Sequence, residues 1–290
     1  MTLTSKPPDH SCDLNSVKPL GPEEFDQLRR LAHTTFGLDL KAGKEELVAA
    51  RLQGLVRAAG FSNYRDYYRH VIEDSTGEAL ASMIDALATN HTSFLREPDH
   101  FDFLRREVIP MLAGREWIEI WSAACSTGEE VWTLACLLHE AVPSRKMRIW
   151  ATDISRKALD FAARACYPAE RCVGVPAEWL SRYFTPSGSP KAYRVAPQVR
   201  SVVRFRRLNL LEPCTWPRPF PVIFCRNVMI YFDKATQERV VRQLSECLEP
   251  GGYLLVGHAE SLTRVAHSLE YVRPAVYRKP RRGGDPWSRS

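Results

Sequence analysis

Small residues and acidic side chains follow an apolar run near the middle of the chain, a combination that can bind a cofactor. The apolar run covers residues 117–121, the small residues cover 122–128, and a helix-like stretch begins at Glu129. This order predicts a strand, a tight turn and a helix. Small side chains let the backbone approach a ligand, and the first turn of a helix offers N–H groups without intrahelical partners and a positive partial charge. We therefore expect this turn to bind a cofactor.

A second apolar run ends in Asp153, about 25 residues after Gly128. In doubly wound folds, an acidic residue roughly 20 residues past the glycine turn accepts hydrogen bonds from ribose hydroxyls. Asp153 is therefore the predicted ribose anchor, and the two signals together favour an adenosine-containing ligand. The turn holds a single glycine and lacks the dinucleotide fingerprint. The alternative is a strand–helix–strand unit with a solvated acid after its second strand.

The composition is that of an ordinary globular protein. With 290 residues, of which 44% are hydrophobic and 26% charged, the chain can bury a substantial core and is long enough for two domains. It has no run of about 18 apolar residues and starts with a polar, proline-bearing segment, so we expect no membrane insertion and a cytoplasmic location. The eight cysteines form no CxxC pair and are expected to be free thiols.

The net charge of +6 is concentrated in short segments. Residues 191–207 hold six basic side chains and no acid, and the end of the chain is also basic, whereas residues 18–85 are near neutral. A basic tail is more often a solvated end than a binding arm. We therefore expect no nucleic-acid partner from the charge alone.

The spacing of apolar residues divides the chain into a helical part and a part that alternates strands with helices. Helical spacing runs from residue 22 to about 87, and the alternation from residue 117 onward predicts a parallel sheet. A proline-rich stretch interrupts it, and in residues 199–207 apolar side chains alternate with arginine. That pattern predicts a half-exposed antiparallel strand within an inserted hairpin that has one basic face. The last strand is predicted at residues 271–277.

These patterns predict five segments with a polar connector between the two folded parts. They are a disordered tail (1–16), a helical N-terminal domain (17–88), a linker with a connecting helix (89–115), an α/β domain (116–278) with a β insertion at about 170–207, and a basic disordered tail (279–290). The connector places Asn90 and Arg96 at a domain junction, where ligand clefts commonly lie. An arginine in a polar connector is usually exposed to solvent. This pattern alone therefore does not decide whether Arg96 is a surface residue or a residue of the site.

Five short motifs stand in a fixed order along the chain. They are NHTSFLRE from residue 90, WSAACSTGEE from 121, ATDIS from 151, FCRNVMIYFD from 224 and LEPGGYLLVGHAESL from 248. Together they resemble the CheR-type chemotaxis receptor glutamate methyltransferases, which use S-adenosylmethionine, and the resemblance covers roughly residues 20–278. It implies an α/β fold with a doubly wound class I methyltransferase sheet, a small antiparallel β insertion and a preceding small all-α domain.

The resemblance also implies the functional residues. Arg96 and Tyr231 would be the catalytic pair nearest the chemistry. The residues that it assigns to the cofactor are Asn90, Thr92 and Arg96 in the cleft, Glu129 at the methionine end, Asp153 at the ribose, Asn209 and Leu210 at the adenine, and Arg226 and Asn227 in the remaining wall.

No metal is expected. Neither His91 with His100 nor His258 with His267 has a helix-face ligand spacing with a nearby set of Cys or carboxylate residues.

The implied activity is methyl transfer from S-adenosylmethionine to glutamate carboxylates of a chemoreceptor, which gives glutamate methyl esters and S-adenosylhomocysteine. The implied partner is the cytoplasmic helical region of the receptor, and we expect the helical domain and the basic hairpin to contact it. One alternative is a methyltransferase of a small molecule or nucleic acid, since phosphates attract basic patches such as residues 191–207. Another is a non-catalytic module that binds S-adenosylmethionine and docks to a receptor. The oligomeric state stays open.

Overall fold

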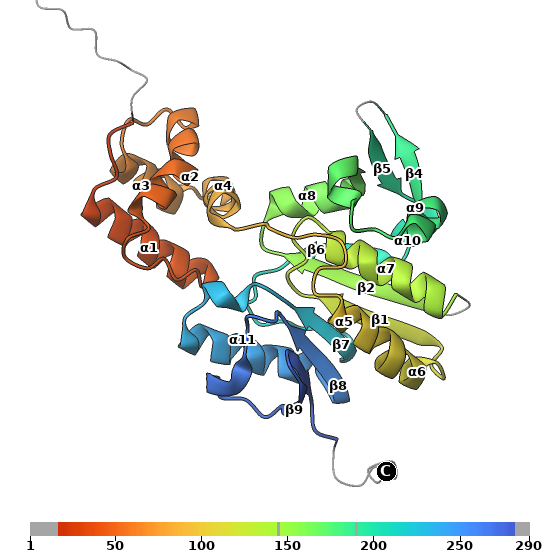
Figure 1. The fold of residues 1–290 in the computed structure, drawn as a ribbon. Helices are drawn as coiled ribbons and strands as arrows, with labels where there is room; N and C mark the ends of the chain where they lie inside the picture. The colour runs from red at the N-terminus through yellow and green to blue at the C-terminus, as the bar shows by residue number, and fades with distance from the viewer. Residues whose placement is uncertain (1–16, 144–145, 189–190, 282–290) are drawn as a thin grey trace, which may run out of the picture. The chain divides into compact units, whose positions relative to one another are not determined.

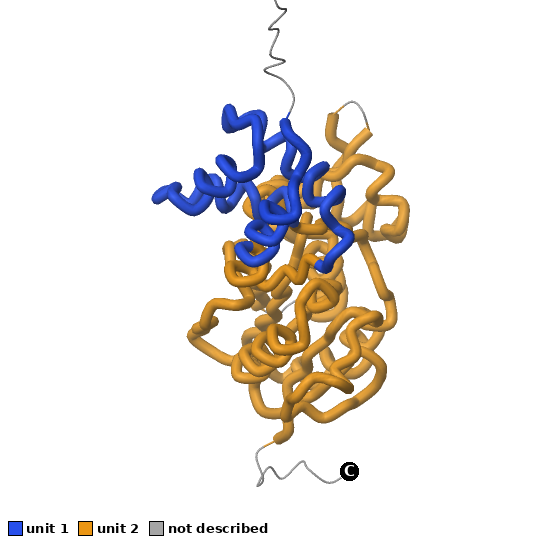
Figure 2. The backbone as a smooth tube through the Cα atoms, turned by 90° about the vertical axis from the view of Figure 1, so that its left-hand side faces the viewer, with its two compact units in different colours: residues 1–31, 41–87 blue, residues 32–40, 88–290 orange. Residues whose placement is uncertain are grey.

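The computed structural model describes residues 17–143, 146–188 and 191–281, which belong to two compact units (Figure 2). The first unit comprises the residues up to 31 together with 41–87, and the second comprises 32–40 and the chain from 88 onward. The predicted tail at 1–16 and most of the one at 279–290 lie outside the described residues. Within the described ranges, no helix has the length and apolar character needed to cross a membrane.

The described residues of the first unit form helices and the loops that connect them. Its helices are α1 (Pro22–Phe36), whose last residues belong to the second unit, α2 (Glu45–Ala58), α3 (Tyr64–Glu73) and α4 (Glu78–Leu87). Every fourth residue along one face of α2 is apolar and fully buried, namely Val48, Leu52 and Val56. Helix α3 begins after Asn63, whose side chain accepts a hydrogen bond from the backbone N–H of Asp66 at 2.9 Å.

The second unit is built on a seven-stranded sheet with the order β6-β2-β1-β7-β8-β10-β9. Its strands are β1 (Trp117–Ser122), β2 (Lys146–Asp153), β6 (Val203–Arg207), β7 (Phe220–Cys225), β8 (Leu248–Val256), β9 (Glu270–Arg273) and β10 (Val276–Arg278). The first five are parallel to one another, whereas β10 runs antiparallel to β8 and β9. The single last strand predicted at 271–277 was wrong, because the chain turns at Ala275, which has a φ of +61°, and forms two short strands.

Helices cover both faces of this sheet, as Figure 1 shows for α7 and α11. The helical segments of the unit are α5 (Asp99–Phe103), η1 (Leu104–Val108), α6 (Ile109–Leu112), α7 (Glu129–Ala141), α8 (Arg156–Arg164), η2 (Ala169–Cys172), α9 (Ala177–Tyr183), α10 (Pro197–Arg200), η3 (Met229–Tyr231), α11 (Lys234–Cys247) and η4 (Leu262–Arg264). Successive residues of β7 point to opposite faces, so Val222 and Phe224 pack in the cluster that contains α7, and Ile223 packs in the cluster that contains α11. A parallel sheet with both faces covered is the doubly wound fold that the sequence predicts, and the fold class is confirmed.

A small antiparallel sheet follows β2 and α8. It has the order β3-β5-β4 and consists of β3 (Cys166–Pro168), β4 (Phe184–Ser187) and β5 (Ala192–Val195). The prediction that residues 199–207 form an antiparallel strand of this insertion was wrong. Strand β6 instead pairs parallel to β2 at the edge of the main sheet, with Val203 opposite Ile149 and Arg207 opposite Asp153. Alternation shows that one face of a strand is exposed but does not reveal the direction of its partner.

The exposed face of β6 has a structural cause. The connection between β6 and β7, residues 208–219, contains no helix, so Arg204 and Arg206 remain exposed while Val203 is buried. Arg194 lies in the small sheet, Arg200 in α10, and Arg204, Arg206 and Arg207 in the main sheet, so the basic residues at 191–207 do not form one face of a hairpin.

Candidate active site

A cavity opens at the carboxyl ends of the parallel strands in the second unit. It is lined by residues at the ends of β1, β2, β6 and β7. Ala123, Leu208 and Arg226 directly follow β1, β6 and β7, and Asp153 is the last residue of β2. The space between its walls, with the open mouth included, is ≈ 990 Å³, which is in the range of sites for small molecules and cofactors. Ligands of doubly wound folds bind at this edge of the sheet. Of the site residues predicted from the sequence, all except Glu129 line this cavity.

The turn between β1 and α7 is held in a tight conformation. Gly128 has a φ of +93° and Ser126 a φ of +49°. The phenol of Tyr167 donates a hydrogen bond to the carbonyl of Thr127 at 2.6 Å. A Cβ atom on Gly128 would lie 2.7 Å from the Cβ atom of Ala162. Only glycine fits here, both because of its backbone conformation and because α8 packs closely against the turn.

Replacing Gly128 by alanine will therefore destabilise the protein and weaken cofactor binding. The left-handed conformation costs about 1–2 kcal/mol for a residue with a Cβ atom, and the contact with Ala162 adds about 1–3 kcal/mol of strain. Gly43→Ala is the matched control, because Gly43 also has a positive φ of +86° but no atom within 4 Å of the added Cβ. Thermal unfolding of both variants checks this expectation, and equal losses of stability would contradict the close packing at Gly128.

Asp153 is fixed at the end of β2 with its carboxylate bordering the cavity. One carboxylate oxygen accepts the backbone N–H of Ser126 at 2.8 Å, and the other accepts the backbone N–H of Ser155 at 2.9 Å. These bonds set the orientation of the carboxylate before any ligand arrives. The hydroxyl oxygen of Ser126 is buried without a hydrogen-bond partner in the described structure, so a polar ligand group would satisfy it.

The loop after β6 forms an apolar part of the wall. Leu208 and Leu210 line the cavity and are almost completely buried. The side chain of Asn209 serves the loop itself, because its amide N–H₂ donates to the carbonyl of Thr35 at 2.7 Å and its oxygen accepts the N–H of Leu211 at 3.1 Å. A planar ring at this place would therefore meet the leucine side chains and the loop backbone.

Arg226 connects three segments in the inner wall of the cavity. Its guanidinium donates to Glu130 at 2.9 Å, to Glu97 at 3.0 Å and to the backbone carbonyl of Arg96. The arginine side chain is only 2% exposed, so this charge is paired inside the protein. Burial alone would raise the pKa of Glu97, but hydrogen bonds from Asn227 and Arg226 hold it below its usual value. Arg226 thus ties the polar connector to the ends of β7 and α7.

Glu260 supports the same wall from the segment after β8. One of its carboxylate oxygens accepts the backbone N–H of Asn227 at 2.7 Å and that of Gly257 at 2.6 Å, and the other accepts Ile230 at 3.1 Å. Burial raises the pKa of Glu260, although these backbone donors oppose the rise. Asn227 needs this support because its φ is +57°.

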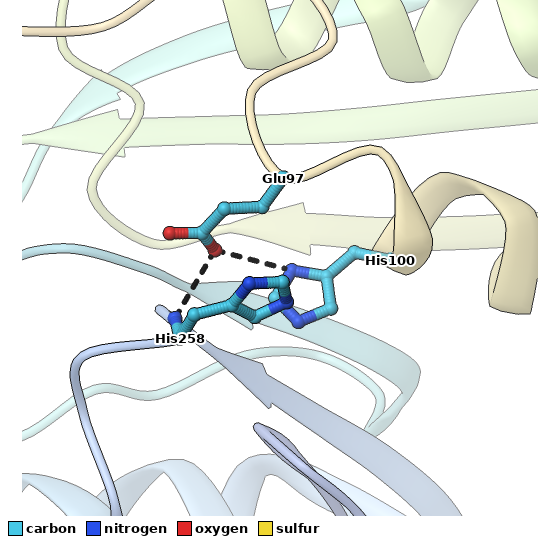
Figure 3. A group of neighbouring side chains, drawn as sticks. All are labelled: Glu97, His100 and His258. Atoms are coloured by element: carbon cyan, nitrogen blue, oxygen red, sulfur yellow. Dashed lines mark hydrogen bonds and ion pairs between the residues drawn. The ribbon is translucent and has the colours of Figure 1, made fainter.

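Glu97, His100 and His258 form a group with the composition of a metal site (Figure 3). One Glu97 oxygen lies 3.5 Å from Nδ1 of His100 and accepts the backbone N–H of His258 at 3.2 Å. The same oxygen is also bonded to the guanidinium of Arg226, and a fixed positive charge beside it opposes the binding of a cation. Burial and the nearby Arg226 lower the pKa of His100 to about 3, so the ring is neutral. The donor set fits a polar support of the wall better than a metal centre.

Glu129 does not reach the cavity. It is fully buried at the start of α7, where its carboxylate pairs with Arg171 and accepts a hydrogen bond from the hydroxyl of Thr127 at 2.7 Å. Its neighbour Glu130 lines the cavity and accepts a hydrogen bond from Ser122 at 2.7 Å. Adjacent residues of a helix differ in direction by about 100°, which is why only one of the two faces the cavity.

The pair of Glu129 and Arg171 makes the stability of the turn depend on pH. Burial raises the pKa of Glu129, and Arg171 opposes the rise. Arg171→Ala will raise this pKa further. A carboxyl group with a raised folded-state pKa destabilises the protein increasingly as pH rises above the unfolded value near 4.3. The loss of thermal stability in Arg171→Ala will thus be larger at pH 8 than at pH 5. Adding Glu129→Gln will remove most of that difference, and an unchanged pH dependence would contradict the pairing.

The two residues predicted nearest the chemistry are both half-buried in the cavity wall. The guanidinium of Arg96 donates to the carbonyl of His91 at 2.7 Å, which folds the connector around it. Tyr231 lies at the end of η3, and its backbone carbonyl accepts the N–H of Asp39 at 2.8 Å. Asn90 and Thr92 line the same cavity from the connector.

Sequence reasoning missed four polar residues of this region. Glu130 and Ser126 line the cavity, and Glu97 and Glu260 hold the residues that do. Each lies within one of the five motifs, so the motifs carried a signal for them. The bonds of Glu260 to Asn227, Glu130 to Arg226 and Glu97 to Asn227 join residues 33, 96 and 130 positions apart in the sequence, and local spacing cannot reveal such pairs.

Two family models together match most of the chain. The model described as "CheR methyltransferase, SAM binding domain" matches residues 90–277, and that described as "CheR methyltransferase, all-alpha domain" matches residues 23–88.

Curated relatives are similar over nearly their whole length. A chemotaxis protein methyltransferase of Borreliella burgdorferi is 37% identical over 89% of this chain and 94% of its own length. Chemotaxis protein methyltransferase 2 of Pseudomonas aeruginosa is 36% identical over 88% of this chain and 92% of its own. The chemotaxis protein methyltransferase of Salmonella typhimurium is 34% identical over 89% of this chain and 90% of its own.

Proposed function

Because the chain belongs to the CheR methyltransferase family and is an S-adenosylmethionine-dependent methyltransferase, we propose that it methylates glutamate side chains of a chemoreceptor. The products are glutamate methyl esters and S-adenosylhomocysteine. The observation that carries this proposal is one cavity whose lining includes Asp153, with its fixed carboxylate, together with Arg96 and Tyr231. The proposed ribose-binding acid and the two proposed donors for a carboxylate substrate thus line the same cavity.

The residues present fit the cofactor. Asp153 offers carboxylate oxygens to ribose hydroxyls, and the buried hydroxyl of Ser126 needs a polar partner beside it. Leu210 and the loop backbone at Asn209 would contact the adenine. Glu130, which faces the cavity, is better placed than Glu129 to serve the methionine end. Asn90, Thr92 and Asn227 would complete the wall, and Arg226 would act mainly by holding Glu97 and Glu130 in place.

The reaction requires orientation more than proton transfer. S-adenosylmethionine supplies an electrophilic methyl group on sulfur. A glutamate side chain with a pKa near 4.3 is ionised by roughly 500 to 1 at pH 7, so no general base is needed. Arg96 would orient the substrate carboxylate through its N–H groups, and the hydroxyl of Tyr231 would donate one more hydrogen bond. Together they would align one carboxylate oxygen with the methyl group and limit the access of water.

The proposed partner is the cytoplasmic helical region of a chemoreceptor, and the reaction is placed in the cytoplasm on that account. The helical unit and the β3-β5-β4 insertion are the proposed contact surfaces. A nucleic-acid substrate is less well supported, because the basic residues at 191–207 belong to separate elements of two sheets and a helix instead of one hairpin face.

The test is a methylation assay with methyl-labelled S-adenosylmethionine and a receptor cytoplasmic fragment. We expect label that mild alkali releases as methanol, since carboxyl esters are base-labile. Tyr231→Phe removes a single donor and will lower the rate about tenfold, in line with a hydrogen bond of about 1.4 kcal/mol. Arg96→Ala will lower it further at unchanged thermal stability. Alkali-resistant label would instead show N-methylation, and cofactor binding without transfer to any receptor would support a non-catalytic module.

A further inference from the structure

A groove lined by tryptophan and arginine lies on the face of the main sheet that faces the helix-free connection 208–219. Its principal lining residues are Trp117, Arg148, Trp150, Trp216 and Arg218. Trp117 begins β1, and Phe220, which also lines the groove, begins β7. The groove therefore lies toward the amino ends of these strands, whereas the proposed cofactor cavity lies at their carboxyl ends. It is separate from the proposed active site.

The aromatic and basic side chains of the groove pack against one another. The guanidinium of Arg148 lies 5.3 Å from the ring centre of Trp117 and 5.7 Å from that of Trp150. The rings of Trp150 and Trp216 are 5.1 Å apart, and Arg206 lies 5.3 Å from Trp216. Trp117 remains 39% exposed. Tryptophan and arginine are the residues most enriched at the energetic centres of protein interfaces.

The charge of the groove indicates the chemistry of its occupant. Glu119 lies 3.2 Å from Arg148, and Glu116 lies 2.7 Å from Lys146, so these acids are already paired with bases. Arg206 and Arg218 are exposed at its rim. The groove thus presents net positive charge around an apolar floor, which complements a segment that carries carboxylates and an apolar side chain.

Other occupants fit less well. A second copy of the chain would bring like charges together at this surface. Bases of single-stranded nucleic acid need a broad free ring face to stack on. Guanidinium groups of the chain lie against the rings of Trp117, Trp150 and Trp216, so a small aliphatic side chain, which can pack on the remaining ring edges, fits better than a base. A lipid surface favours protruding apolar side chains, but these rings line a hollow.

We propose that this groove docks an extended acidic segment of a partner protein, with carboxylates at Arg206 and Arg218 and an apolar side chain against the tryptophans. This function is independent of the methyl-transfer proposal, since the groove shares no residue with the cofactor cavity.

The test uses the full chain and a fluorescein-labelled peptide in which glutamate and leucine alternate. The control is the same peptide with lysine in place of each glutamate. Fluorescence anisotropy will show that the protein binds the acidic peptide but not the lysine peptide. Its affinity for the acidic peptide will fall as salt is added. Arg218→Glu will weaken binding about tenfold or more, while Arg264→Glu, an equal charge change at an exposed residue of η4, will leave it unchanged. Both variants will bind S-adenosylhomocysteine as the parent does, which shows that they are folded.

Four binding results would overturn the proposal. The first is equal binding of both peptides, and the second is an equal loss of peptide affinity in Arg218→Glu and Arg264→Glu. The third is binding of the protein to anionic phosphatidylglycerol vesicles with no binding of the peptide. The fourth is binding of the protein to a single-stranded oligonucleotide that Arg218→Glu abolishes, again with no binding of the peptide. A dimer in sedimentation that Arg218→Glu dissociates would assign the groove to self-association instead.

Discussion

Asp153→Ala will raise the Kd for S-adenosylmethionine and for S-adenosylhomocysteine about a hundredfold. The carboxylate of Asp153 is fixed by the backbone N–H groups of Ser126 and Ser155, so it meets a ribose without prior reorganisation. A hydrogen bond to a charged group contributes about 1.5–3 kcal/mol, and two such bonds to the ribose hydroxyls account for a loss of about 3 kcal/mol. Isothermal titration calorimetry measures this loss directly.

Two variants separate the lost ligand contact from damage to the turn. Asp153→Asn keeps the size of the side chain and one good acceptor, so we expect a loss of about tenfold. Asp160→Ala removes an exposed acid of α8 and will leave the affinity unchanged. If Asp153→Ala binds S-adenosylhomocysteine as tightly as the parent, Asp153 is not the ribose anchor.

Arg226→Ala will destabilise the protein by about 3–5 kcal/mol, because Glu97 and Glu130 would lose their buried positive partner. For a unit of this size, that loss lowers the thermal midpoint by about 10 °C. The thermal stability of Arg226→Lys will lie between those of the parent protein and Arg226→Ala, because one ammonium group cannot replace the several N–H groups that now reach two carboxylates and a carbonyl. Differential scanning calorimetry checks the order.

The pH dependence of Arg226→Ala follows from the pKa of Glu97. In the folded parent protein this pKa lies below its usual value. The ionised Glu97 therefore stabilises the fold at any pH above its pKa in the unfolded chain, near 4.3, and this stabilisation is lost as the pH falls through its lower pKa in the folded protein. In the variant the unpaired carboxyl groups can protonate on acidification. The stability gap between parent and variant will therefore be widest at neutral pH and will narrow below about pH 4. A gap that stays constant would mean that packing, not charge, explains the loss.

The outline of the fold could be predicted because it depends on local patterns. The apolar run at 117–121, the small turn and Asp153 predict a strand, a helix start and a second strand end, and each of these elements is present. The direction of β6 could not be predicted, because alternation of Val203 and Arg204 reports exposure alone. Its parallel pairing depends on β2, some fifty residues earlier in the chain.

The site was predictable in position but not in all its contacts. The end of β2 placed Asp153 at the cavity, and the motif order added Arg96 and Tyr231. Which of Glu129 and Glu130 faces the cavity depends on the rotation of α7 about its axis. The sequence does not determine this rotation closely enough to distinguish two adjacent residues. The bond between Arg226 and Glu97 joins residues 129 positions apart, and no periodicity reports such a pair.

Four residues with positive φ around the cavity have a further consequence for binding kinetics. Leu95, Glu97, Ser126 and Asn227 each adopt this uncommon backbone conformation, which persists only where surrounding bonds enforce it. The binding surface is therefore preorganised, and little ordering entropy remains to be lost when a ligand enters. The ligand is then expected to bind in one step, at a rate set by its diffusion into the opening of the cavity, without a slow rearrangement of the cavity walls.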